Sequence, residues 1–499
     1  MYHKIKFTGV PTILVLAFTV MSIMLEAQPQ NQASLDIDIT RAVENQLEWN
    51  SAAPAHLIDV KTREGVVTLS GSVGNILSKD HAERIARKIR GVVSVVNNIE
   101  VRPVDRTDEQ LKQEVQMALY NDPATEKQGI DAKVEDKVVT MNGKIESWAE
   151  KKLSEYVVKS VRGVREVKNN LEVEVPEERS DEDLMEDIKA RLRYDIMVDH
   201  GLINVIVNNG EATLTGIAGS AAEKSRAETL AHVPGVKSVD ATQIEIQPWS
   251  ADEMLRKEEV SEVTDGEIKE AIESALLYDP RVYYPDIDVT VDDGVVTLTG
   301  KVDSMKGRMS ATQTVNNTVG VKRVINKIHV RPEEIEDNQS LGDKVRNALE
   351  RDPYLERFDI LVTAENGKVF LRGAVDTYFE KKRATEVASR VKGVVDIYNA
   401  LNISKQWQWK EDRRIRKDVE ENMKWDCEVN EDNLIVTVDN GVATINGTVD
   451  TWWEEKCAVN SALEAGAKAV ESNLNVRAEK ENFPQTYTRE FLDYSEILY

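Results

Sequence analysis

The sequence lacks the residue patterns on which most enzymes depend. It has neither a glycine-rich phosphate loop nor a G-x-S-x-G nucleophile turn. No two histidines have the spacing of a metal site. The six are His3, His56, His81, His200, His232 and His329. We therefore expect no catalytic residues, no metal and no cofactor.

An excess of basic residues is also absent. The chain has 64 Lys and Arg against 88 Asp and Glu, a formal net charge of −24. An acidic chain repels phosphates, so nucleic acid is not an expected partner. The charge is uneven, because residues 34–103 contain 9 basic and 9 acidic residues, whereas residues 411–476 contain 7 and 15. The N-terminal part is therefore the most compatible with an anionic partner.

Long apolar runs are missing after the first residues of the chain. The run from Val10 to Leu25 follows two lysines and precedes a polar, Gln-rich segment. This order is typical of a signal peptide, which we place at residues 1–27, with an uncleaved anchor as the alternative. No cysteine follows the run, which argues against a lipoprotein. We expect a periplasmic protein without a transmembrane span after cleavage.

What the chain does contain is one heptapeptide, G-V-V-T-L-S-G in its first copy, that recurs six times. Each copy ends at a glycine that we expect to be structural: Gly71, Gly143, Gly216, Gly300, Gly373 and Gly447. Their spacing is nearly constant, apart from one longer interval between Gly216 and Gly300. A G-V-x-x-V-x-N-x-[IL] pattern follows each glycine at an almost fixed distance, in weakened form in the third copy. Solenoid repeats span roughly 20–50 residues, so this longer period predicts small autonomous domains in tandem.

These repeats divide the chain into six modules. Modules 1 to 6 are residues 34–103, 107–175, 180–248, 264–332, 340–404 and 411–476. Residues 249–263 fill the longest interval, and residues 477–499 form a C-terminal tail. We therefore predict two groups of three modules, joined by a linker at 249–263 that mild proteolysis cuts first.

The order of elements within a module follows from its hydrophobic periodicity. Thr264 and Glu267 form a capping box before a helical pattern that ends at Asp279-Pro280. Two alternating segments around Asp292-Asp293-Gly294 predict a β-hairpin, then a second helix and a third strand follow. The fold class is α+β, with an α-β-β-α-β order, two layers and a three-stranded mixed sheet.

The two faces of the sheet differ in polarity. Val296 and Leu298 lie on one face, which both helices should cover, while Thr297 lies on the other. The outer face is either solvated or packed on a neighbouring module. A large side chain at the start of the second helix, such as Trp148 or Trp452, either caps the core of its own module or contacts a membrane or partner.

Together these features resemble the BON domain, named for bacterial osmotically inducible periplasmic proteins and nodulation proteins. The resemblance rests on the Asp-Pro stop, the x-G-x-V-x-L-x-G hairpin, the Ala-rich second helix and the terminal strand pattern, and it covers nearly all of residues 34–476. It implies an exported binding module associated with phospholipid and with envelope integrity under osmotic stress. Six copies exceed the usual number, and module 3 matches least, with Asp240-Ala241-Thr242 in place of the asparagine-containing sequence.

A basic helix in module 1 is the candidate lipid-binding feature. Arg84, Arg87 and Lys88 lie outside the expected core face of residues 79–90, whose local charge is +3. Near an anionic membrane each well-placed Lys or Arg contributes about 1 kcal/mol. The alternative is a solvated basic face.

The only cysteines, Cys427 and Cys457, fall in module 6. In an oxidising compartment they either form a disulfide that closes a loop of about 30 residues or remain two separate thiols.

Three function classes follow. The chain is an envelope-protective binder of anionic phospholipid or envelope proteins, a periplasmic holdase for unfolded clients, or an architectural spacer.

Overall fold

The structure, a computed structural model, describes residues 34–50, 55–174, 179–247, 263–282, 284–332, 337–404, 410–476 and 485–488. The predicted signal peptide, nearly all of the predicted linker and most of the C-terminal tail lie outside these described residues. Within them the α-β-β-α-β order recurs in all six modules, which confirms the predicted α+β class.

Each module has a first helix, a hairpin, a second helix and a third strand. The first helices are residues 34–49, α3 (Asp108–Asn121), α5 (Asp181–Tyr194), α9 (Asp265–Leu277), α11 (Asn338–Arg351) and α13 (Asp412–Trp425). The second helices are α2 (Ile76–Lys88), α4 (Trp148–Lys159), α6 (Ala221–Leu230), α10 (Met305–Asn316), α12 (Tyr378–Ser389) and α14 (Trp452–Glu464).

The strands form one sheet in each module. The hairpins are β1 (Ile58–Arg63) with β2 (Val66–Val73), β5 (Asp131–Glu135) with β6 (Val138–Ile145), β8 (Ile203–Asn208) with β9 (Glu211–Ala218), β11 (Ile287–Asp292) with β12 (Val295–Val302), β15 (Leu361–Glu365) with β16 (Lys368–Val375), and β18 (Leu434–Asp439) with β19 (Val442–Val449). The third strands are β3 (Ser94–Asn97) with β4 (Glu100–Val101), β7 (Glu166–Val173), β10 (Ser238–Ile246), β13 (Arg323–Asn326) with β14 (His329–Val330), β17 (Asp396–Ile403) and β20 (Ala469–Val476). The second hairpin strand is always central, antiparallel to the first and parallel to the third.

A single side chain ties the first helix to the hairpin turn. Asp265, in the first turn of α9, accepts hydrogen bonds from the backbone N–H groups of Asp293 and Gly294 at 2.8 and 2.9 Å. The same two hydrogen bonds recur in modules 1, 2, 3 and 6, where the helix residue is Asp36, Asp108, Asp181 or Asp412, and in module 5 Asn338 accepts one, from Asn366. Because Asp293 and Gly294 both have positive φ, the turn has the type I′ geometry that matches strand twist.

The core of each module lies between its sheet and its two helices. In module 4 Val296 and Leu298 have no exposed surface and pack with Ile272 of α9 and Ala311 of α10. The opposite face is more open, and on it Tyr398 of β17 is 64% exposed. Of the two predicted alternatives for the outer face, the structure shows the solvated one.

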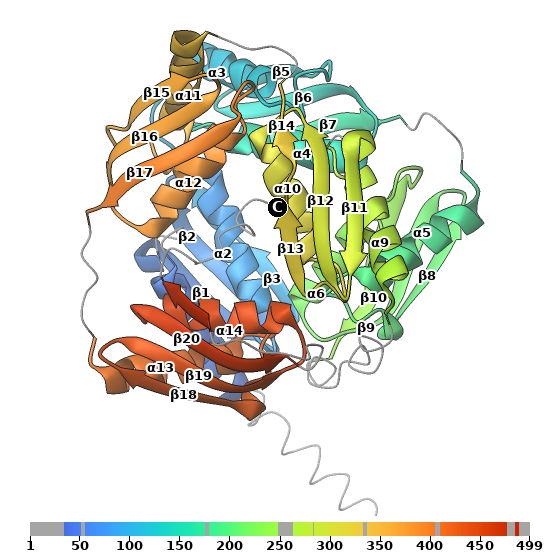
Figure 1. Cartoon of the computed structure of the whole chain (residues 1–499), viewed down its shortest axis with the longest axis vertical. Coiled ribbons are helices and arrows are strands. Elements are labelled where there is room, and N and C mark those ends of the chain that lie inside the picture. Colours follow the sequence, from blue (N-terminus) through green and yellow to red (C-terminus); the bar gives the residue numbers. More distant parts are fainter. Residues whose placement is uncertain are drawn as a thin grey trace, which may run out of the picture.

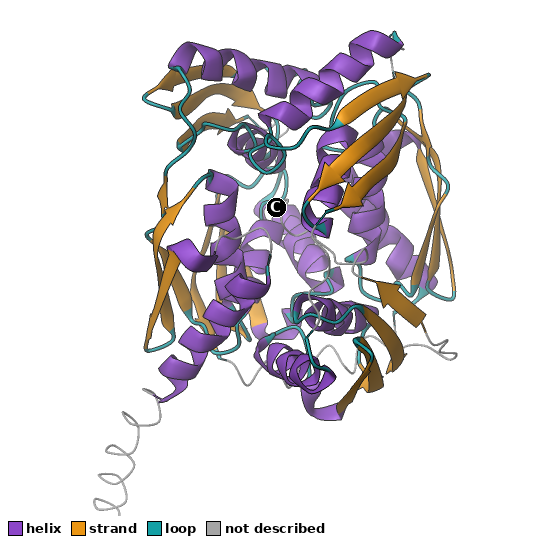
Figure 2. Ribbon diagram, turned by 90° about the vertical axis from the view of Figure 1, so that its left-hand side faces the viewer, coloured by secondary structure: helices purple, strands orange, loops and turns teal. Residues whose placement is uncertain are grey.

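The six modules close into a ring with sheets outward and helices inward (Figures 1 and 2). Backbone hydrogen bonds join module 1 to module 6, module 2 to module 5 and module 3 to module 4. The pairing is therefore nested, with the first module against the last.

Module 6 carries an additional strand. β21 (Gln485–Thr488) pairs antiparallel with β20, from Ala469 opposite Thr488 to Ser472 opposite Gln485. In modules 1, 2, 4 and 5 the residue equivalent to Ser472 is an asparagine, as in Asn169, whose side-chain oxygen accepts the N–H of Leu171 on the same edge strand. Ser472 instead donates to Glu455 at 2.6 Å.

Candidate functional site

The ring encloses a central chamber of about 930 Å³. Side chains from modules 1, 2, 3, 4 and 6 line it, chiefly from α2, α4, α5, α6 and α9. Ligand sites in proteins commonly occupy about 300–1,000 Å³. The chamber therefore has the size of a binding site and forms only when the modules come together.

The three predicted lipid-binding residues lie in the wall of this chamber rather than on the outside of the ring. Arg87 donates to Ser225 of module 3 at 2.7 Å and pairs with Glu83. Lys88 pairs with Glu428 of module 6 at 3.0 Å. Arg84 also lines the chamber. The basic face of α2 is thus turned away from any flat surface outside the ring.

In fact α2 contacts four other modules. Besides Ser225 and Glu428, its partners are Tyr354 of module 5, whose hydroxyl lies 3.1 Å from that of Ser78, and Lys159 of module 2, which pairs with Asp80 at 2.8 Å. Charged side chains of α2, which give module 1 its distinct charge balance in the sequence, therefore largely contact other modules.

Arg191 of α5 is a basic residue of the chamber with no carboxylate at ion-pair distance among the described residues. Its guanidinium lies 5.7 Å from the centre of the Tyr278 ring. Burial, with repulsion from Arg226, lowers the pKa of Arg191 to about 10. Arg226 itself makes two hydrogen bonds to Asp195, at 3.0 and 2.5 Å. An anion in the chamber would stabilise Arg191 in particular.

Aromatic side chains form the apolar part of the wall. Trp148 at the start of α4 stacks on His232 of module 3, with ring centres 3.9 Å apart and planes 5° apart. Burial, with the nearby charges of Lys152 and Arg191, lowers the pKa of His232 to about 4. Trp148 therefore joins two modules, an outcome outside both predicted alternatives. The wall also includes Tyr156, Tyr194, Tyr278 and Trp453.

A buried polar network lies beside the chamber, between modules 2 and 5. Arg390 pairs with Asp122 across the interface at 2.9 Å. Arg383 makes two hydrogen bonds to Asp352 of its own module, at 2.8 and 2.6 Å, and one to the Tyr156 hydroxyl at 2.5 Å. Burial raises the pKa of Tyr156 to about 12, so this phenol stays protonated. Each charge in the network has a partner that offsets its desolvation.

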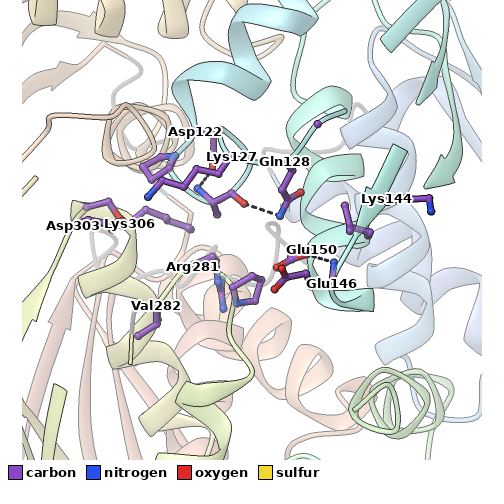
Figure 3. A pocket seen from close by; sticks show the side chains of 16 residues that line it. Asp122, Lys127, Gln128, Lys144, Glu146, Glu150, Arg281, Val282, Asp303 and Lys306 are labelled. Atoms are coloured by element: carbon purple, nitrogen blue, oxygen red, sulfur yellow. Dashed lines mark hydrogen bonds between the residues drawn. The ribbon is translucent and has the colours of Figure 1, made fainter. Parts of the chain in front are cut away.

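A second cavity of about 350 Å³ lies between modules 2 and 4 (Figure 3). Lys306 and Arg281 line it, but Lys306 lies 3.7 Å from Glu386 and Arg281 is held by Asp279 at 2.6 Å. The nearby Glu150 accepts the N–H of Glu146 at 2.8 Å. Because its cations are held by neighbouring carboxylates, this cavity is a weaker candidate than the central chamber.

Cys427 and Cys457 are both free cysteines in the structure. Cys427 lines the chamber, and its N–H donates to the carbonyl of Lys88 at 3.0 Å, which fixes its backbone against module 1. Burial raises the pKa of the Cys427 thiol well above its usual range. Cys457 is buried in the core of module 6 and donates to Glu428 at 3.4 Å. The two side chains therefore have different surroundings.

The six predicted structural glycines share one geometry. Each has a positive φ between +112° and +146°, and a Cβ added to it would lie 2.0 to 2.8 Å from a carbonyl oxygen of the segment before the first hairpin strand. At Gly71 that atom is the Leu57 oxygen, 2.1 Å away. No side chain fits there without a backbone shift.

Two features are absent from the described part of the chain. The described residues contain no group of three or more His, Cys, Asp or Glu side chains that could hold a metal ion. Within the same part of the chain, no helix has both the length and the apolar character needed to cross a membrane.

The sequence did not reveal the residues that join the modules at and beside the chamber. Arg191 of the chamber wall, His232 behind Trp148 and the Arg390–Asp122 pair depend on contacts between modules, and no local pattern marks them. The bulky residue at the start of α4 was the one available signal, because Trp148 stands out there.

A family comparison divides the chain into the same six modules. The BON domain family matches residues 36–103, 107–175, 180–248, 264–332, 337–405 and 411–478. Osmotically-inducible protein Y of Escherichia coli (strain K12) is 31% identical over 121 residues, which cover 23% of this chain and 60% of that protein. The outer membrane lipoprotein DolP of Haemophilus influenzae is 27% identical over 139 residues, 27% of this chain and 72% of that protein. A solved structure of CdsD, a structural protein of the type III secretion system of Chlamydia trachomatis, is 19% identical, covers 42% of this chain and 90% of that one, and has a TM-score of 0.12.

The matched segment thus spans less than two thirds of the first of these relatives. The family matches, by contrast, account for most of the chain, and the six sheets follow the same boundaries. The resemblance noted in the sequence is therefore confirmed: the chain belongs to the BON domain family and contains six BON domains in tandem.

Proposed function

We propose that this chain is a non-enzymatic, periplasmic protein that binds an anionic phospholipid in the central chamber and so protects the cell envelope under osmotic stress. The observation that carries the proposal is the composition of the chamber wall. It combines Arg191, which has no carboxylate at ion-pair distance among the described residues, with the aromatic rings of Trp148 and Tyr278. Arg84, Arg87 and Lys88 also line the chamber, although Arg87 and Lys88 already pair with Glu83 and Glu428. An anionic headgroup suits the guanidinium of Arg191, and acyl chains suit the aromatic rings.

The two relatives support the cellular setting. One is named as osmotically inducible and the other as an outer membrane lipoprotein. Export through a cleaved signal peptide remains part of the proposal, since residues 1–27 lie outside the described structure.

The proposal is tested with purified protein and a soluble short-chain phosphatidylglycerol, titrated by calorimetry below its micelle concentration. We expect saturable binding, and no binding of the matching phosphatidylcholine. Arg191→Glu should weaken binding at least about tenfold, because it replaces a charge-assisted contact with repulsion. Lys189→Glu makes the same change in charge on the exposed side of α5 and should leave affinity unchanged. Equal losses in both variants, or no binding by the unmodified protein, would overturn the proposal.

A second candidate function, holding unfolded clients, is favoured by one observation. The edge of β20 has already accepted an additional strand, β21, through backbone hydrogen bonds. Suppression of client aggregation without phosphatidylglycerol binding would favour this candidate over the first.

A further inference from the structure

The ring has an internal two-fold symmetry, which relates modules 1, 2 and 3 to modules 4, 5 and 6 and is independent of the proposed function. The position numbers of equivalent glycines differ by 300 − 71 = 229 for Gly300 and Gly71, by 373 − 143 = 230 for Gly373 and Gly143, and by 447 − 216 = 231 for the last pair. Modules 4, 5 and 6 are thus offset from modules 1, 2 and 3 by a nearly constant number of positions. The contacts between modules follow this offset.

The two outer contacts are equivalent under this offset. Ile89 lies opposite Asp426 where modules 1 and 6 meet, and Thr318 lies opposite Asp195 where modules 4 and 3 meet. The offset between Ile89 and Thr318 is 318 − 89 = 229, and that between Asp195 and Asp426 is 426 − 195 = 231.

Both contacts have the same two backbone hydrogen bonds. Arg90 N–H donates to the Trp425 carbonyl at 2.8 Å, as Val319 N–H donates to Tyr194 at 2.9 Å. In return, Cys427 donates to Lys88 and Ile196 donates to Asn317, each at 3.0 Å. In each case the end of a second helix in one half meets the end of a first helix in the other half.

The middle contact, between modules 2 and 5, is reciprocal. Arg162 pairs with Glu356 at 2.5 Å, and Lys392 pairs with Glu126 at 2.8 Å. Arg162 and Lys392 occupy equivalent positions, since 392 − 162 = 230, and so do Glu126 and Glu356, since 356 − 126 = 230. Each module supplies one cation and one carboxylate, which is the arrangement of a two-fold interface between identical subunits.

From this symmetry we infer that the chain consists of two complementary halves, residues 34–247 and 263–488. The surface that each half turns to the ring interior is a specific binding site for the other half. The central chamber is complete only when both are joined, because α2, α4 and α6 come from one half and α9 and α10 from the other.

One contact disfavours pairing of the N-terminal half with a copy of itself. The buried pair Arg390–Asp122 has no counterpart in the other direction, because the equivalent residues are Ser160 and Asp352. If the N-terminal half paired with a copy of itself, Ser160 would stand where Arg390 stands now, and Asp122 would remain buried without that cation. The C-terminal half is therefore the preferred partner, rather than a second copy of the N-terminal half.

The experiment uses the full chain with a single protease site inserted within residues 248–262. After complete cleavage, we expect the two fragments to elute together in size-exclusion chromatography, at the volume of the uncut protein. Separation of the fragments at micromolar concentration would overturn the inference.

Charge reversal tests the interface itself. The cleaved double variant R162E/K392E places like charges opposite Glu356 and Glu126, so its fragments should separate, and adding E126K and E356R should restore their association. R346E, in an exposed pair within module 5, is the control and should not separate them. Circular dichroism of each uncut variant verifies folding. Failure of the compensating changes to restore association in folded protein would contradict a specific interface, and equal self-association of a tagged N-terminal fragment would contradict the partner preference. Neither readout depends on lipid.

Discussion

Arg390 of module 5 donates a hydrogen bond to Asp122 of module 2 at 2.9 Å, and the side chains of both residues are less than one tenth exposed. The two residues are 268 positions apart in the chain. A charge pair so far from solvent contributes to stability mainly because either partner alone would remain buried without compensation.

Asp122→Asn should therefore lower the free energy of unfolding by about 3 kcal/mol, the lower end of the range for breaking a buried ion pair. We expect the lower end because Arg390 keeps a second carboxylate, that of Glu386, at 3.6 Å. Urea unfolding monitored by circular dichroism measures the loss. Arg346→Met removes an exposed pair and should cost less than about 1 kcal/mol. If the double replacement Asp122→Leu with Arg390→Met recovered none of the loss, desolvation of the orphaned charge would not be its cause.

Gly71→Ala should destabilise module 1 by about 2 kcal/mol or more. The new Cβ would lie 2.1 Å from the Leu57 oxygen, at a backbone conformation that side chains rarely adopt. Hydrogen exchange of the β1 and β2 amides measures the local effect. Gly74→Ala is the matched control, since nothing lies within 4 Å of a Cβ at that position. Equal exchange rates in the two variants would contradict this account.

His232 should make the protein sensitive to mild acid. Its pKa is about 4 in the folded chain and about 6.5 when unfolded, so protons bind preferentially to the unfolded state below pH 6.5. The resulting stability is fully present above pH 6.5 and is lost as the pH falls toward 4. His232→Phe preserves a ring beside Trp148 and should avoid a loss of about 2 kcal/mol at pH 4.5 relative to pH 7.5.

Urea unfolding midpoints at the two pH values provide the measurement. His329→Phe replaces an exposed histidine of β14 and serves as the control. A pH dependence unchanged by His232→Phe would exclude this histidine as the source.

Both cysteines should be alkylated in denatured protein without reductant, because each is a free thiol. In the native protein the reaction should be slow, since Cys457 is buried and burial raises the pKa of the Cys427 thiol. Mass spectrometry of non-reduced protein provides the measurement. A mass lower by two hydrogens, with no label incorporated, would show a disulfide instead.

Much of each module could be predicted from local sequence. The capping box at Thr264 and the hairpin turn at Asp293-Gly294 both form as expected, because their geometry depends on residues close in the chain. The Asp265 contact to that turn was missed, although it joins residues only 28 and 29 positions apart. From the sequence alone, an aspartate in the first turn of a helix is expected only to interact favourably with the positive end of the helix dipole.

The arrangement of the modules could not be predicted in this way. Arg87 and Lys88 look like a free basic face in the sequence, whereas the structure places them against Ser225 and Glu428. Those partners lie 138 and 340 residues away, and nothing in the periodicity of α2 identifies them. The chamber is a property of the assembled ring.

The nested pairing also fixes the number of modules. A linear array of domains can gain or lose one member at its end, but here the first module is bonded to the last, so removal of any one leaves a partner with exposed helix ends. A shortened or lengthened chain can retain a closed ring only if modules are lost or gained in matched sets. The smallest set whose loss leaves no module without its partner is therefore one of the three pairs, module 1 with 6, 2 with 5 or 3 with 4, whereas the gain of a single domain would leave one unpaired.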